Sequence, residues 1–324
     1  MGGHRVQALV EHRSTRRQIA RALHAGGLSV EFIGALGEID GAAVAEAPRV
    51  LLLELDGRDA VDAAMAHLGS APPAVVLLSQ GSDKQVPSYV LRSAALDHLV
   101  AQRRVASGAQ PSVEERELLV TCKKILTRDI FGIDKYIDGS GIIVHRHRVT
   151  STKDKLRVLD QFQLYLTALD CHATIQASIV NTADELIRNA IVHAPHRDGK
   201  PRYEHLPTCA ELTLEPEEQV EVEYGCDGQR LMLSVVDHFG RLTKQTISRY
   251  LARSEEPGVT PETKASGAGL GMGMAFRTVH ELVVNVEAHR RTEVIVGWSL
   301  RISSGAEFRQ MEKSINFFQS GAPG

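Results

Sequence analysis

The first hundred residues alternate short apolar runs with segments of helical periodicity. The apolar runs have the length of buried strands and cover 6–11, 29–34, 49–55, 74–79 and 96–101. Between them, 14–27 and 59–69 carry apolar residues at helical spacing and close on glycine. Alternating strands and helices predict a doubly wound α/β fold with a mostly parallel sheet over residues 1–105.

Residues 106–150 have the pattern of a linker followed by a connecting helix. One helical face over 113–130 carries the apolar residues Leu118, Leu119, Cys122, Ile125 and Leu126. This face could pack on the second domain or pair with another copy of the chain in a homodimer. The basic run 142–156 is expected to be a solvated loop that leads into a helix.

The second half has a different pattern, and we expect an α+β domain over 151–305. Two helices are predicted within 155–195. The following runs alternate in the manner of strands and cover 210–216, 220–237, 281–289 and 292–302. Asp227-Gly228, between two alternating runs, predicts a tight hairpin. The tail 306–324 contains apolar residues and could dock on this domain or on a partner.

Composition narrows the class of protein. The 324 residues are 43% hydrophobic and 24% charged, with a formal net charge of −3, so no general nucleic-acid binder is indicated. The four cysteines show no CxxC spacing, which fits a reducing compartment rather than a zinc cluster. No apolar run has the length of a membrane span and the N-terminus lacks a signal-peptide core, so we expect a cytoplasmic protein.

Three elements of the second half carry candidate chemistry. Glu185, Asn189 and His193 share one helical ridge, where the amide and the carboxylate could hold Mg²⁺ or the ridge could be a solvated polar edge. Asp237 ends a buried strand, where it could accept a hydrogen bond from an adenine amine or cap the strand with an Asx turn. The glycine-rich run 266–276 could bring backbone amides to phosphates or serve as a flexible turn.

In this order the three elements resemble the N, G1 and G2 boxes of the GHKL superfamily. That superfamily includes sensor histidine kinases, anti-sigma-factor serine kinases, Hsp90-type chaperones and type II topoisomerases. The resemblance covers 151–302 and implies a Bergerat α/β sandwich that binds ATP with Mg²⁺. It implies a metal-binding role for Asn189 and a catalytic role for Glu185 beside the γ-phosphate. The residues that it implies in nucleotide binding are Asn189, Asp237, Gly240, Gly267, Gly269, Leu270, Gly271 and Thr292.

The G1 box departs from the pattern of the superfamily. Phe239 and Arg241 occupy two positions that are usually glycine, which puts the shape of the adenine pocket in question. The stretch 243–266 would be the mobile ATP lid. Four segments, 127–137, 184–195, 237–243 and 290–294, together resemble stand-alone signalling ATP-binding proteins of Gram-negative bacteria.

The first half resembles a response-regulator receiver, flavodoxin-like in topology, with altered chemistry. Glu54 stands where the phosphoacceptor aspartate is expected, with Asp56 two residues later. Strand one ends in Glu11-His12 instead of an acidic pair, and strand five has Ala101 or Gln102 in place of lysine. Ser79 matches the pattern. The resemblance therefore implies a pseudo-receiver that serves protein contacts.

Together these features predict a bacterial signalling protein that binds ATP and Mg²⁺ and acts on a partner protein. The action would be phosphoryl transfer, to a serine rather than to its own histidine, or binding controlled by the nucleotide. Neither His172 nor His280 has the context of a phosphoacceptor histidine. The alternative is a scaffold without catalysis, which works through protein contacts alone. A chaperone or topoisomerase subunit is disfavoured because no transducer domain follows.

Overall fold

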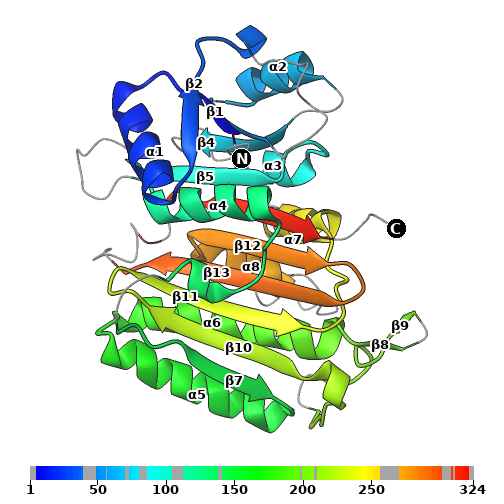
Figure 1. Cartoon of the computed structure of the whole chain (residues 1–324). Coiled ribbons are helices and arrows are strands. Elements are labelled where there is room, and N and C mark those ends of the chain that lie inside the picture. The colour runs from blue at the N-terminus through cyan, green and yellow to red at the C-terminus, as the bar shows by residue number, and fades with distance from the viewer. Residues whose placement is uncertain are drawn as a thin grey trace. The chain divides into compact units, whose positions relative to one another are not determined.

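The structure is a computed structural model, and it divides the chain into two compact units (Figure 1). Unit 1 comprises Met1–Ile130 and Glu312–Phe318, and unit 2 comprises Phe131–Met311 and Gln319–Gly324. The structure describes residues 5–38, 49–55, 57–69, 73–79, 86–103, 112–137, 141–197, 199–207, 210–255, 270–300, 308 and 311–320. Within these residues no helix combines the length and apolar character needed to cross a membrane.

Unit 1 contains the expected parallel sheet. Its strands are β1 (Arg5–Leu9), β2 (Ser29–Phe32), β3 (Val50–Glu54), β4 (Ala74–Ser79) and β5 (His98–Arg103). They lie in the order β2-β1-β3-β4-β5, which is one of the common orders of doubly wound sheets. Each strand begins and ends within three residues of its predicted bounds. Buried parallel strands are recognisable because they form continuous apolar runs in the sequence.

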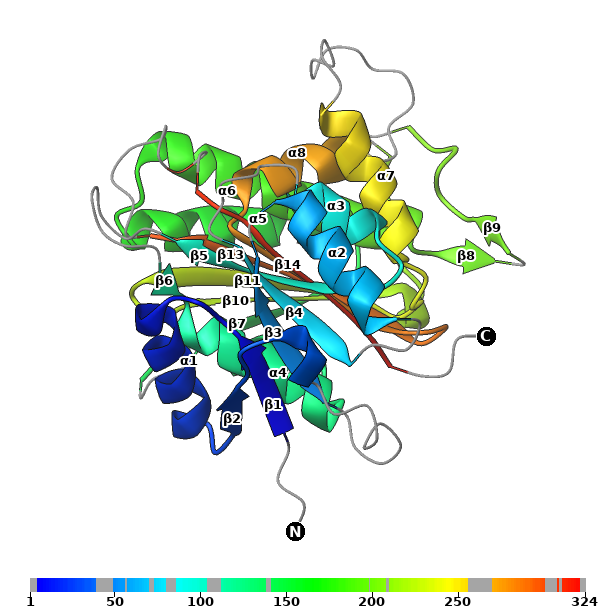
Figure 2. The same cartoon turned by 90° about the horizontal axis from the view of Figure 1, so that it is seen from above.

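Helices cover both faces of this sheet (Figure 2). They are α1 (Arg13–Ala25), α2 (Arg58–Leu68), α3 (Val86–Arg92) and α4 (Glu115–Thr127). Helices α1 and α4 share one buried core, and α2 and α3 share the other. Helix α4 was expected to connect the domains, yet Leu118, Cys122 and Leu126 bury its apolar face in unit 1. Helix α3 was not predicted.

The C-terminal segment also belongs to unit 1. Strand β14 (Ser314–Ser320) pairs antiparallel with β5, so that Ile315 lies opposite Leu99. Ser314 Oγ accepts a hydrogen bond from the backbone N–H of Ala101 at 2.9 Å. Part of the expected tail is therefore a strand that pairs with β5 of the first unit. The short strand β6 (Ser112–Val113) pairs with the end of β5.

Unit 2 is built on an antiparallel sheet in the order β12-β13-β11-β10-β7. Its strands are β7 (His145–Val149), β10 (Val220–Cys226), β11 (Arg230–Asp237), β12 (Glu281–Glu287) and β13 (Arg291–Ser299). The β10–β11 hairpin turns at Asp227-Gly228 as predicted, with Gly228 at φ 83°. Strand β7 corrects the expected loop over 142–156. The strand expected over 210–216 is reduced to a single bridge at Thr213.

The helices of unit 2 lie on one face of its sheet (Figure 2). They are α5 (Thr152–Ala168), α6 (Ala173–Arg188), α7 (Lys244–Glu255) and α8 (Leu270–Thr278). Helix α5 begins where Ser151 Oγ accepts from the N–H of Asp154 at 3.1 Å, an N-cap. Helix α7 occupies much of the predicted ATP lid, so the first half of that segment is regular structure. Short elements complete the chain: η1 (Leu36–Glu38), η3 (Ile133–Lys135), η5 (Pro216–Glu218), β8 (His196–Arg197) and β9 (Lys200–Pro201).

Candidate functional site

In unit 1, the carboxylate of Glu54 is held entirely by donors of the protein. Its Oε2 accepts from the backbone N–H groups of Glu11 and His12 at 3.1 and 3.3 Å, and His12 Nδ1 lies at 3.3 Å. Its Oε1 accepts from Gln102 Nε2 at 2.9 Å. Burial raises the pKa of Glu54, but the hydrogen bonds from Gln102 and His12 outweigh burial and lower the pKa below its ordinary value.

The residues that replace the receiver pattern therefore form one network. His12, Glu54 and Gln102 were each singled out in the sequence as departures, and the structure brings them together. Ser79 lies buried at the end of β4. Asp56 lies outside the described residues. The network leaves Glu54 committed to backbone and side-chain donors of its own unit.

In unit 2, the helix that carries Asn189 changes its winding at that residue. Helix α6 ends at Arg188, and Asn189–His193 form a π-helical turn. Ala194 N–H donates to the carbonyl of Asn189 at 3.0 Å, a bond between residues five apart. A π-turn adds one residue to the helical repeat, and such turns occur frequently at functional sites. Here it places Asn189 and His193 on the wall of one cavity.

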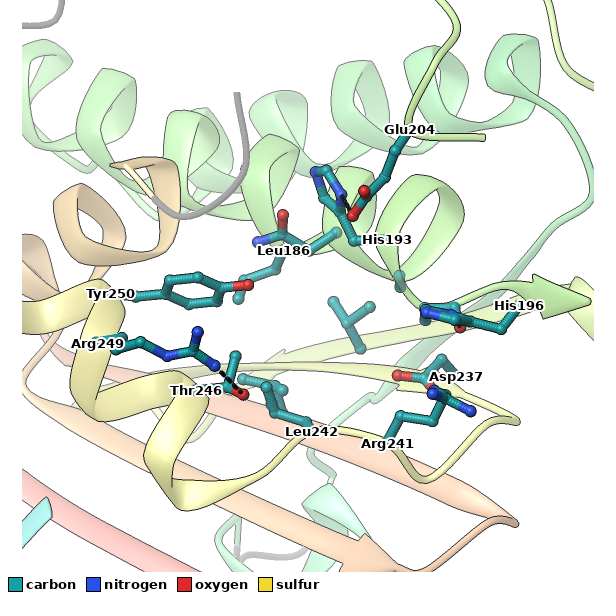
Figure 3. A pocket seen from close by; sticks show the side chains of 15 residues that line it. Leu186, His193, His196, Glu204, Asp237, Arg241, Leu242, Thr246, Arg249 and Tyr250 are labelled. Carbon is teal, nitrogen blue, oxygen red and sulfur yellow. Dashed lines mark hydrogen bonds and ion pairs between the residues drawn. The ribbon is translucent and has the colours of Figure 1, made fainter. Parts of the chain in front are cut away.

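This cavity lies between the π-turn, the end of β11 and helix α7 (Figure 3). It has a volume of about 340 Å³, which falls within the range of small-molecule sites. Its apolar wall consists of Leu186, Ala190, Ala194, Val235, Leu242 and Val294. Its polar groups come from Asn189, His193, His196, Glu204, Asp237, Arg241, Thr246, Arg249 and Tyr250. An apolar wall combined with convergent polar groups is a common form of a ligand site.

Asp237 is one of two carboxylates that line this cavity, and Glu204 is the other. Its Oδ1 accepts from the backbone N–H of Phe239 at 2.9 Å, so the Asx turn considered from the sequence is present. Burial raises the pKa of Asp237 to about 6, against opposing hydrogen bonds from the N–H groups of Phe239 and Gly240. The side chain of Thr292, which lies opposite Asp237 on β13, also lowers the pKa. A ligand amine would supply the donor that favours the ionised form.

Asn189 offers an uncommitted polar atom. Its Nδ2 atom is buried and has no hydrogen-bond partner among the residues that the structure describes. Because the amide can turn by 180° and exchange its oxygen and nitrogen, this position can present a donor or a metal-binding oxygen. Among the described residues, no group of three or more His, Cys, Asp or Glu side chains could hold a metal ion. A magnesium ion here would therefore depend on Asn189 and on ligand phosphates, a donor set that Mg²⁺ accepts.

Glu185 does not line this cavity. Arg188 holds both of its carboxylate oxygens, with Nη2 at 2.7 and 2.8 Å and Nε at 3.1 Å. The pair is half-buried and lies within one turn of α6. The carboxylate of Glu185 is thus bonded to an arginine of the same helix. The catalytic role of Glu185 stays a prediction.

Gly240 has a structural reason to be glycine that needs no ligand. Its φ is +59°, in the left-handed region. A Cβ at this position would lie 2.1 Å from the carbonyl oxygen of Glu287 and 2.8 Å from the N–H of His289. The backbone after β11 thus touches the β12–β13 turn, and His289 N–H donates to the Gly240 carbonyl at 3.2 Å.

The glycine-rich segment is described only in part. Gly267 and Gly269 lie outside the described residues. Leu270 and Gly271 open helix α8 rather than precede it, which corrects the expectation of a turn through Gly271. Helix α8 packs beside α6, where the hydroxyls of Thr182 and Thr278 lie 2.8 Å apart.

Sequence reasoning missed much of the cavity wall. The side chains of His193, Glu204, Arg249 and Tyr250 line it, yet only His193 was noticed, as part of a ridge. Arg241, which appeared only as a departure from a glycine motif, also lines it. In the part of the chain that the structure describes, the Arg241 guanidinium forms no ion pair. Arg241 and Arg249 are both exposed, and they add positive charge to the cavity wall. Their spacing in the sequence does not predict this arrangement.

Compared with known proteins, the chain matches no family model and no curated protein. The interpretation of the cavity consequently depends on its own geometry.

Proposed function

We propose that unit 2 binds an adenine nucleotide with Mg²⁺ in the cavity between the π-turn and β11. The observation that carries this proposal is the position of Asp237, a partly buried carboxylate with a raised pKa that lies in the cavity beside its apolar wall. An adenine ring would fill the apolar part, and its exocyclic amine would donate to Asp237. This is the role that resemblance to the GHKL superfamily implies for the same residue.

The phosphate end of the nucleotide would extend past the π-turn toward α7. Asn189 would hold Mg²⁺, and Arg241 and Arg249 would meet phosphate oxygens, since guanidinium groups bind phosphates in a planar, bidentate manner. Arg249 is available for this purpose because its described contact is a long one, 3.5 Å from Thr246 Oγ1. Thr292 would act through Asp237, because it neighbours that residue across the sheet.

Within a signalling protein of the proposed kind, unit 1 would serve protein contacts as a pseudo-receiver. The Glu54 network supports this role, because donors of the protein satisfy the carboxylate where a receiver would bind metal and phosphoryl groups. Unit 2 would act on a partner protein by phosphoryl transfer or by nucleotide-controlled binding.

The test is calorimetric titration of ATP into the full chain with and without Mg²⁺. We expect Mg²⁺-dependent binding in the wild type, at least tenfold weaker binding in Asp237→Asn, and loss of the Mg²⁺ dependence in Asn189→Ala. The exposed His205 does not line the cavity, so His205→Gln is the matched control and should bind as the wild type does. No binding to the wild type at millimolar ATP would overturn the proposal and favour a scaffold.

A further inference from the structure

Helix α1 of unit 1 concentrates positive charge on its outward face. Its 13 residues include four arginines and no aspartate or glutamate, whereas the whole chain has a formal net charge of −3. Arg13, Arg17 and Arg21 are exposed and follow one another at intervals of four residues. At about 1.5 Å of rise per residue, they form one row of about 12 Å along the helix. We call these three residues the arginine ridge.

The opposite face of α1 is already occupied by the core of unit 1. Ile19, Ala22 and Leu23 are buried, and α1 shares this core with α4. The helix therefore has no free apolar face for a membrane surface or for a hydrophobic groove. A partner that contacts α1 from outside would meet its arginines.

Contacts within the protein neutralise the arginine ridge only in part. In the part of the chain that the structure describes, Arg13 and Arg17 form no ion pair. Arg21 pairs with Glu115 of α4, and the two side chains are 72% and 36% exposed. Such surface pairs contribute little to stability, so a partner that offers several carboxylates can compete with Glu115.

The arginines are unfavourable for the helix that carries them. Helix α1 begins at Arg13, its first turn contains no acidic residue, and its N-cap His12 makes no capping hydrogen bond with its side chain. Because the N-terminus of a helix carries a partial positive charge, cations there reduce helix stability and carboxylates increase it. Residues that break a local rule of this kind are often those that a protein uses for function.

The start of α1 is held in place by contacts of its own unit. Glu54 Oε2 accepts hydrogen bonds from the backbone N–H groups of Glu11 and His12 at 3.1 and 3.3 Å. Arg16 Nε donates to the carbonyl of Val10 at 2.6 Å. Glu54 thus fixes the residues that lead into the helix, and the helix backbone need not reorder when a partner binds the arginine ridge.

We propose that the arginine ridge docks an acidic helix of a partner protein, with aspartate or glutamate at intervals of four residues. Such a helix repeats its carboxylates about every 6 Å, which matches the spacing of the arginines. Guanidinium groups bind carboxylates in a bidentate manner, which adds specificity to the charge. The inference specifies the protein contact proposed for unit 1 and rests on that proposal, but it does not depend on nucleotide binding by unit 2.

A nucleic acid fits the same surface less well. Glu11 is exposed two residues before the ridge, and Glu115 lies at its other end beside Arg21. A phosphate backbone, which carries negative charge along its whole length, would meet these carboxylates as well as the arginines. A helix with carboxylates on one side can place them against the arginines alone.

The test measures how a defined helical probe binds to the full chain. The probe is a fluorescently labelled, hydrocarbon-stapled alanine helix with glutamate at every fourth position. The matched probe has the same composition with glutamate at every fifth position, which spreads the carboxylates around the helix. In fluorescence anisotropy at low salt, we expect the first probe to bind at least about fivefold more tightly than the second. An increase from about 50 to about 500 mM NaCl should weaken its binding at least about fivefold, because the contact is electrostatic.

Charge reversals separate docking from folding. Arg13→Glu and Arg17→Glu should each weaken binding of the first probe at least about fivefold. Arg92→Glu is the control, because Arg92 is an exposed arginine of α3 in the same unit, and it should change binding less than about twofold. Arg13→Glu should unfold at the same temperature as the wild type or at a higher one, since it places a carboxylate in the first turn of α1. A loss of binding in this variant would therefore not result from unfolding.

Each contrary outcome rejects the inference. Absence of binding, equal binding of the two probes, or unchanged binding in Arg13→Glu and Arg17→Glu would overturn it. Tighter binding of a DNA duplex of about 20 base pairs than of the first probe would also overturn it, because the ridge would then be a nucleic-acid site. The calorimetric titration of ATP is independent of these results, so the inference and the proposed nucleotide site can fail separately.

Discussion

At the residue scale, the ionised carboxyl group of Asp237 should lower the stability of the fold and strengthen the proposed binding of a nucleotide. Burial raises its pKa from 3.8 to about 6, so the folded state binds this proton more tightly than the unfolded state does. The resulting stabilisation is complete below pH 3.8 and is lost as the pH rises through about 6. A tenfold difference in proton affinity corresponds to about 1.4 kcal/mol, so the ionised group costs up to ~3 kcal/mol.

Replacement of Asp237 by asparagine should therefore stabilise the protein without nucleotide while weakening binding. We expect the free energy of unfolding of unit 2 at pH 8 to rise by about 1–3 kcal/mol. Near pH 4 the variant and the wild type should agree, because the wild-type carboxyl is protonated there. Urea unfolding at both pH values checks this, and an equal or lower stability of the variant at pH 8 would contradict it.

Glu54 titrates in the opposite sense. Its lowered pKa means that its hydrogen-bonded, ionised form stabilises unit 1 above about pH 4.5, and that this stabilisation is lost as the pH falls through the folded-state pKa. Glu54→Gln should lower the unfolding free energy by about 1–3 kcal/mol at pH 7 and by much less at pH 3. Glu11→Gln is the control, because the Glu54 network uses only the backbone N–H of Glu11. Equal effects of both substitutions in urea unfolding would refute the network.

At the scale of elements, the turn after β11 depends on a close backbone approach. Gly240→Ala would combine a φ of +59° with a clash against the Glu287 carbonyl, so we expect a loss of at least about 2 kcal/mol. Gly228→Ala is the matched control. Gly228 has a φ of +83° with open space around it, and the cost should be limited to about 1 kcal/mol. Equal losses in thermal unfolding would show that the contact with the β12–β13 turn is not formed.

The elements that the sequence predicted are those whose apolar pattern is independent of their neighbours. Apart from the edge strand β2, the strands of unit 1 are buried on both faces, and β10 and β11 flank a hairpin turn with its own signal. Strand β7 was expected to be a loop because histidine and arginine alternate along it. It is an edge strand whose exposed arginines face Glu221 and Glu223 of β10. That partner is distant in sequence, so the local pattern does not show it.

The candidate site was predictable only in part for the same reason. Asn189 and Asp237 fall in recognisable motifs, and both line the cavity. The π-turn depends on where the helix end packs, and no composition rule indicates it. Glu204 and Arg249 lie in segments without a motif and reach the cavity only through folding. The role of Gly240 in backbone packing is likewise set by a turn that comes 47–50 residues later in the chain.

At the scale of the whole molecule, the C-terminal strand completes the first unit of the chain. Ile315, Phe317 and Phe318 are buried, and the Phe318 ring lies 4.5 Å from that of His98. Arg103 joins this strand to α4, since it donates to Ser314 Oγ at 2.8 Å and to the buried Glu117 at 2.9 Å. Burial raises the pKa of Glu117, which Arg103 counteracts.

Removal of residues 312–324 should consequently destabilise unit 1, because it exposes the edge of β5 and leaves the Arg103–Glu117 pair without Ser314. We expect Phe318→Ala alone to cost about 3 kcal/mol, whereas Gln319→Ala, at an exposed position of the same strand, should cost less than 0.5 kcal/mol. Near-UV circular dichroism during thermal unfolding gives the comparison. A truncated protein as stable as the full chain would contradict the assignment of β14 to unit 1.

Hydrogen exchange read by mass spectrometry would locate an adenine nucleotide in the cavity of unit 2 directly. With saturating ATP and Mg²⁺, we expect slower exchange in two segments, 186–194 around the π-turn and 235–242 at the end of β11. Asp237→Asn should reduce this protection at the same ligand concentration. Unchanged exchange in both segments of the wild type, or protection confined to unit 1, would show that the nucleotide does not bind in this cavity.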